Sequence, residues 1–142
     1  MDRALAVVAI VLVATVATAC GTGSSASEPA DLPGTSWSVK SVGATVADAT
    51  LPPTIVFGLD GVVSGMTGCN TYNGSYKLDG ARIAIGPLAT TLMLCEGPAG
   101  ALEPRFAAAL QGATAWSIGA DGNLTLTGAG DIVATWVSTG TP

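Results

Sequence analysis

The side chains that could do chemistry in this sequence are three cysteines and a scattered set of carboxylates. The cysteines are Cys20, Cys69 and Cys95, and the 142 residues also include ten acidic residues, five basic residues and no histidine. Without histidine a thiol has no imidazole to activate it, and two cysteines alone make a poor zinc site. The cysteines therefore indicate lipidation or disulfide formation rather than catalysis.

The carboxylates show no catalytic pattern. Asp60, Asp79 and Asp121 each precede a glycine, where aspartate usually stabilises a turn. A glycosidase-type site needs two carboxylates that face each other across a cleft. No such pairing is visible in the sequence for the others: Asp48, Glu96, Glu103 and Asp131. Because phosphate loops, nucleophile elbows and metal-ligand clusters are also missing, we expect no enzyme, no cofactor and no metal.

The N-terminus predicts export and a lipid anchor. After Arg3, residues 4–19 form an uncharged run of 16 residues, which is short for a bilayer crossing but typical of a signal peptide. The small residues before Cys20, and Gly21 after it, resemble a bacterial lipobox, in which the cysteine receives a diacylglycerol. Residues 1–19 are thus expected to be removed and Cys20 to anchor the protein to the cell membrane, outside the cytoplasm.

Two departures leave alternatives to lipidation. Ala17 stands where a lipobox usually has leucine, and Asp2 offsets the charge of Arg3. An ordinary signal peptide or a retained helix would make Cys20 incidental. Residues 20–33 are rich in Gly, Ser, Ala and Pro without apolar periodicity, which predicts a tether, and the folded domain is expected over 34–139.

The charge of the chain limits its partners. The net charge is −5, the sequence pI is about 4.2, and the basic residues are scattered. A nucleic-acid-binding protein needs clustered Lys and Arg. We therefore expect no nucleic-acid partner and a membrane contact through the lipid.

Lipidation of Cys20 leaves an even pair, Cys69 and Cys95, in an oxidising compartment. A disulfide between them is the natural interpretation. A metal site or a reactive thiol remains the alternative.

Short β patterns separated by glycine-containing turns fill the rest of the chain. The strand candidates are 35–42, 54–59, 62–68, 75–78, 82–85, 115–118, 123–127 and 131–137. Three Asp-Gly pairs between apolar runs predict hairpins. Leu102, Phe106 and Leu110 share a helical face, and Pro104 suits a first turn, so one helix is predicted to begin near Glu103. The fold class is mainly β: a small antiparallel barrel or strongly curved sheet of about eight strands, with the helix over an open end or edge.

One stretch is distinctive enough to suggest a family. Residues 68–76 read GCNTYNGSY, and residues 89–95 read ATTLMLC. This pair of motifs resembles the META domain, the HslJ-like family, and the similarity extends over about residues 32–137. The resemblance implies a lipocalin-like barrel with one helix, and it implies that the two motif cysteines can be paired. It implies no known reaction, only a loose link to envelope stress.

Asn70, Tyr72 and Tyr76 are the remaining candidate site residues. Asparagine can bond its own backbone in a turn, and the two tyrosines face the same side if the segment is a strand. They either pack a core or rim, or face a ligand.

The expected function is that of an envelope-anchored, non-catalytic protein with a binding or protective role in envelope stress. The alternatives are a carrier of a small apolar ligand in a barrel cavity, or a protein-binding inhibitor of an envelope hydrolase. The sequence names neither the ligand nor the protein partner.

Overall fold

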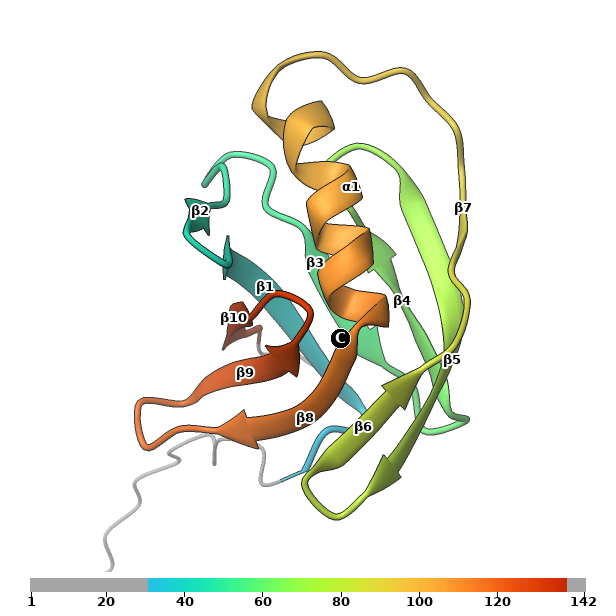
Figure 1. Ribbon diagram of the computed structural model, residues 1–142, viewed down its shortest axis with the longest axis vertical. Helices are drawn as coiled ribbons and strands as arrows, with labels where there is room; N and C mark the ends of the chain where they lie inside the picture. Colours follow the sequence, from blue (N-terminus) through green and yellow to red (C-terminus); the bar gives the residue numbers. More distant parts are fainter. Residues whose placement is uncertain (1–30, 138–142) are drawn as a thin grey trace, which may run out of the picture.

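The computed structural model describes residues 31–137, which form one sheet and one helix (Figure 1). Cys20, the predicted signal peptide and most of the predicted tether lie outside these residues. The elements are β1 (Thr35–Val42), β2 (Thr45–Val46), β3 (Thr54–Phe57), β4 (Val62–Met66), β5 (Thr71–Asp79), β6 (Arg82–Ile85), β7 (Ala89–Thr90), α1 (Gly97–Gln111), β8 (Ala113–Ile118), β9 (Asn123–Gly128) and β10 (Ile132–Trp136). Among the described residues, no helix has the length and apolar character to span a membrane.

Eight of the strands close into an antiparallel barrel. The order is β1-β3-β4-β5-β6-β8-β9-β10, and β10 pairs back to β1 over Trp37↔Trp136 to Val42↔Ile132. The two-residue strands β2 and β7 lie beside β1 and β5. The predicted barrel of about eight strands with one helix is thus confirmed.

The three predicted Asp-Gly hairpins all form. They join β3 to β4, β5 to β6 and β8 to β9, and Gly61, Gly80 and Gly122 adopt positive φ angles of 79°, 57° and 73°. Such angles cost glycine little because it has no Cβ. Strand β5 begins earlier than predicted, at Thr71, so most of the GCNTYNGSY motif is strand.

The helix begins six residues before the predicted position. It starts at Gly97 rather than near Glu103, because Pro98 takes the first-turn place that we assigned to Pro104. Pro104 therefore lies inside the helix, where it has no N–H to donate. The buried face does carry Leu102, Phe106 and Leu110 as predicted, together with Ala109.

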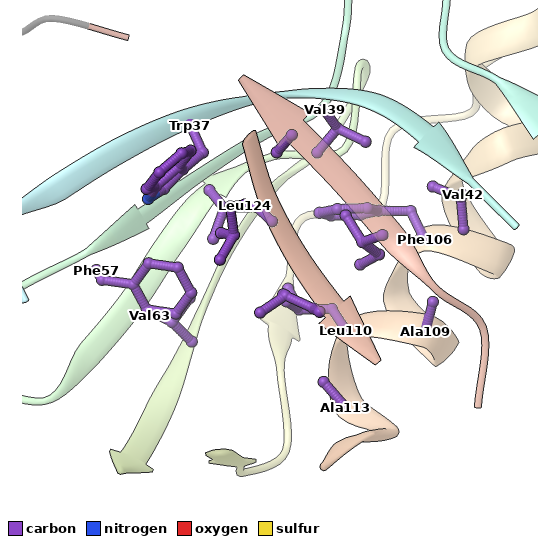
Figure 2. Packing of buried hydrophobic residues seen from close by; sticks show 14 of the residues in the cluster. Trp37, Val39, Val42, Phe57, Val63, Phe106, Ala109, Leu110, Ala113 and Leu124 are labelled. Carbon is purple, nitrogen blue, oxygen red and sulfur yellow. The ribbon is translucent and has the colours of Figure 1, made fainter. Parts of the chain in front are cut away.

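The helix crosses one end of the barrel. It contacts the neighbouring strands β1 and β10 and also β6, which lies across the ring from them, so it spans the opening (Figure 1). Figure 2 shows Phe106 and Leu110 reaching from α1 into the same cluster as Val42 of β1 and Leu124 of β9. One end of the barrel is thus closed by a helix that follows β6 and β7 and precedes β8.

Side chains fill the barrel interior. Trp37, Phe57, Phe106, Leu110 and Leu124 have no exposed surface. A cavity large enough for a water molecule would give the side chains that line it accessible surface, so the interior around these residues is packed.

The domain begins slightly earlier than its composition predicted. We assigned Leu32 to the tether, but its side chain is fully buried, and its carbonyl accepts bonds from the backbone N–H and the hydroxyl of Thr35. A single leucine in a polar, flexible-looking segment is invisible to periodicity. Its burial fixes the point where the chain enters the barrel.

Candidate functional site

The two motif tyrosines lie in the core and link β5 to β3. The Tyr72 hydroxyl donates to the carbonyl of Thr54 at 2.7 Å, and the Tyr76 hydroxyl donates to the carbonyl of Gly58 at 2.7 Å. Each ring also meets a phenylalanine edge-on, Tyr76 with Phe57 and Tyr72 with Phe106. Both tyrosines therefore pack the barrel rather than face a surface hollow.

Burial perturbs both phenols. It raises the pKa of Tyr72 far above the ordinary tyrosine value. It also raises the pKa of Tyr76, and the carboxylates of Asp31 and Asp60 add to that rise by repelling the phenolate. These shifts express burial and need no catalytic role.

Asn70 is a buried polar residue at the helix end of the barrel. Only 2% of it is exposed, and it closes a tight turn with Thr67, which is 1% exposed. The Thr67 N–H donates to the Asn70 carbonyl at 2.7 Å, and the Asn70 N–H donates to the Thr67 hydroxyl at 2.9 Å. Gly68 takes a φ of 96° in this turn, and a Cβ there would lie 2.9 Å from the Leu51 carbonyl oxygen.

The Asn70 side chain uses all its hydrogen-bonding capacity across the chain. Its Oδ1 accepts from the Met93 N–H at 2.7 Å and from the Thr91 hydroxyl at 2.8 Å. Its Nδ2 donates to the Met93 carbonyl at 3.1 Å and to both carboxylate oxygens of Glu103 on α1 at 3.0 Å. One side chain therefore joins the start of β5, the segment after β7 and the helix.

This arrangement turns the backbone of residues 91–95 alternately inward and outward. The Thr91 N–H donates to the Thr71 carbonyl at 3.0 Å, and Met93 bonds to Asn70 through both its N–H and its carbonyl. The two leucines that flank Met93 have exposed side chains: Leu92 is 93% exposed and Leu94 is 95% exposed. Figure 1 shows this segment running past the start of α1.

Cys69 and Cys95 form a second tie at the same place. They are paired as a disulfide, with Cα atoms 6.3 Å apart and a sequence separation of 26, which lies within the range for such bonds. A Glu103 oxygen lies within 4.8 Å of both sulfurs. Bonded sulfurs are not thiolates, so the oxidised site offers a cation little beyond one carboxylate.

A hollow opens beside the same end of the barrel. It measures about 220 Å³ and lies between the β2–β3 loop and the start of α1, lined by residues that include Val46, Leu51, Ala99 and Arg105. Val46 and Leu51 are 79% and 58% exposed. The helix end of the barrel therefore carries exposed apolar side chains on two sides of α1.

The sequence identified Asn70 and the cysteines as candidate site residues but did not predict which residues they contact. Glu103 was expected near the start of the helix and as a carboxylate without a visible partner, and Thr91 only as part of a motif. The exposure of Leu92 and Leu94 was also missed. The available indication was an apolar Leu-Met-Leu run between hydrogen-bonding Thr91 and paired Cys95, too short to be a core strand.

The fold and the site together define a class: a filled, closed antiparallel barrel, capped by one helix, with a cross-linked apolar segment beside the cap. The META domain family model matches residues 30–139, and the chain belongs to that family. The chain is similar to a protein from Burkholderia xenovorans solved by NMR, with 24% identity, a TM-score of 0.65, and coverage of 75% of this chain and 84% of that one. A second NMR structure has 26% identity, a TM-score of 0.60, and coverage of 72% and 88%. No curated protein matches the chain.

Proposed function

We propose that this protein is a non-catalytic, lipid-anchored binding module of the cell envelope. It binds a partner protein through the apolar segment Leu92–Leu94. The observation that carries the proposal is the exposure of two leucines, 93% and 95%, on a backbone held by a buried asparagine. Leu92, Met93 and Leu94 are consecutive and all exposed, and contiguous exposed apolar surface, unlike single exposed residues, often marks an interaction site.

The packed interior favours this function over the carriage of a small apolar ligand. A carrier barrel needs a lined cavity. Here the inward-facing side chains, such as Trp37, Phe57 and Leu126, have no exposed surface. The proposed binding surface therefore lies on the outside of the barrel.

The position of the chain entry also supports the proposal. Residues 31–34 lie at the opposite end of the barrel from the segment that joins β7 to α1 (Figure 1). A domain tethered through Cys20 would therefore present Leu92–Leu94 away from the bilayer, toward proteins of the envelope.

Exchange of Cys20→Ser tests the anchor: the variant should leave the detergent phase or stay unprocessed. A mature-length variant that remains in that phase would contradict lipidation.

Site-specific photo-cross-linking tests the binding function. A photoreactive amino acid in place of Leu94 should give a discrete adduct in living cells. The same group at Leu59, which is 85% exposed at the β3–β4 turn, should not give that adduct. If both positions label the same proteins, or neither labels any, the segment is not a binding site.

A further inference from the structure

We propose that Leu92–Leu94 is a substrate-like strand that enters the cleft of an extracytoplasmic serine endopeptidase and blocks it. The inference rests on the proposed binding function and names the partner. The enzyme is one whose primary specificity pocket accepts a large apolar side chain, and Leu94 occupies that pocket.

The backbone of the segment offers the bonds that such a cleft requires. Thr91 and Met93 turn their polar groups toward Thr71 and Asn70. Within residues 31–137, the N–H groups of Leu92 and Leu94 donate no hydrogen bond. Two outward amides separated by one residue are the edge that β-strand addition uses, in which main-chain bonds supply affinity and alternate side chains supply specificity.

The side chains match that edge. In an extended segment, residues i and i+2 lie on the same side. Leu92 and Leu94 are both almost fully exposed, whereas Met93 between them is 59% exposed. A partner therefore meets a leucine pair with a free backbone edge, and an apolar pocket in the cleft takes Leu94, as a chymotrypsin-type pocket takes its substrate residue.

The segment is held in place before binding. Asn70 fixes Met93 immediately before Leu94, and the bond to Cys69 fixes Cys95 immediately after it. A strand fixed on both sides loses little conformational freedom on binding, which distinguishes an inhibitor from a flexible substrate of the same sequence.

The same ties would hold the products of cleavage. Hydrolysis of the Leu94–Cys95 peptide bond adds one water, leaving a carboxyl group on Leu94 and an amine on Cys95. Asn70 holds the first new end through Met93, and the disulfide holds the second through Cys69. Because both ends stay in place, the bond can form again with loss of the same water, and the enzyme remains occupied.

Inhibition assays with pure mature domain test the inference, with chymotrypsin, subtilisin and trypsin as probes. The wild-type domain should inhibit chymotrypsin or subtilisin and should not inhibit trypsin, whose pocket requires a basic residue. Leu94→Ala should weaken that inhibition by about 30-fold or more, as expected for a central anchor residue.

Leu94→Lys gives the sharpest outcome, because it should create inhibition of trypsin while abolishing that of chymotrypsin. Leu92→Lys is the matched control: Leu92 is 93% exposed and Leu94 is 95% exposed, but the change at Leu92 should not create trypsin inhibition. Since both positions are exposed, neither change should unfold the domain, which circular dichroism would verify.

Rapid cleavage without inhibition, or no inhibition of chymotrypsin and subtilisin in large molar excess, would overturn the inference. So would equal trypsin inhibition by both lysine variants. These failures are distinguishable from failure of the binding function. If the Leu94 cross-link persists while inhibition is absent, the segment binds a partner of another kind and only the endopeptidase is excluded.

Discussion

At the scale of single residues, Asn70 does the most to organise the site. A buried side-chain amide is costly unless its donors and acceptor are satisfied, and Asn70 is satisfied by groups on the segment after β7 and on α1. Because Asn70 is stable in the interior only while these bonds persist, its burial restrains the positions of Met93 and Glu103. This restraint explains how an apolar segment stays extended without a neighbouring strand on its outer edge.

Replacement of Asn70 should therefore destabilise the domain. In Asn70→Ala, the Met93 N–H and carbonyl and the Glu103 carboxylate lose their partner beside the buried position of Asn70, at a cost of about 2 kcal/mol. Urea unfolding would measure the change. Asn73→Ala is the control, because Asn73 lies three residues later and is exposed, so its effect should stay within about 0.5 kcal/mol. Equal effects at both positions would contradict the role of Asn70.

The two tyrosines predict a loss of stability at alkaline pH. Their folded pKa values are raised above 10.0, so the unfolded chain loses its phenolic protons first, and stability falls as pH rises beyond about 10. Each phenol that is ionised only in the unfolded chain lowers the free energy of unfolding by about 1.4 kcal/mol per pH unit.

Urea unfolding between pH 8 and pH 12, about one unit apart, would measure this slope. Tyr72→Phe should be less stable at neutral pH, since the bond to Thr54 is lost, but should show the shallower alkaline slope. A slope equal to that of the wild-type domain would contradict the burial argument.

Residue types alone predicted part of this picture. The motif drew attention to Asn70, Tyr72 and Tyr76, and alternation placed both tyrosines on one side. Whether that side is core or solvent depends on the curvature of β5, which no local pattern encodes. The contact from Asn70 to Glu103 spans 33 positions and arises only from closure of the barrel.

At the scale of elements, sequence patterns predicted the structure correctly where the turn residues have a strong conformational preference. The Asp-Gly hairpins follow directly from dipeptides that accept positive φ. The start of the helix did not follow, because two prolines compete for the first turn. Pro98 occupies the first turn, because α1 begins close to Cys95 and lies across the barrel opening.

Pro104 in the helix interior gives a prediction of its own. It has no N–H for the carbonyl of Gly100, and it is exposed. Pro104→Ala should restore that bond and raise the free energy of unfolding by about 1–3 kcal/mol, less the flexibility that the unfolded chain gains. Chemical denaturation would measure it, and Pro98→Ala, in the first turn, should change little. Destabilisation by Pro104→Ala would mean that the barrel requires a bend in α1.

The disulfide belongs to the same scale, because it joins the turn before β5 to the start of α1. Cys69→Ala and Cys95→Ala should each destabilise the domain by about 2–4 kcal/mol. The double variant should lose about as much as either single variant, since all three remove one bond. Thiol alkylation of the native, air-exposed domain is the companion measurement. Two reactive thiols, or additive losses, would overturn the pairing.

At the scale of the whole molecule, the barrel is a packed scaffold with different ends. The chain enters at one end, where Leu32 is buried, and the helix closes the other, where Leu92 and Leu94 are exposed. The sequence predicted the closed sheet because many short strands with tight turns have few other ways to bury one face. It could not predict that the interior is full, since packing depends on how side chains from opposite strands meet.

The central claim is that Asn70 holds the segment Leu92–Leu94 by its backbone: the N–H and carbonyl of Met93 bond to Asn70, and within the described residues the N–H groups of Leu92 and Leu94 donate no hydrogen bond. Amide hydrogen exchange of the native domain, resolved by residue, tests it most directly. The Met93 amide should exchange at least about 100-fold more slowly than those of Leu92 and Leu94, and Asn70→Ala should remove that difference. Equal exchange at all three amides in the wild-type domain would show that Asn70 does not hold Met93.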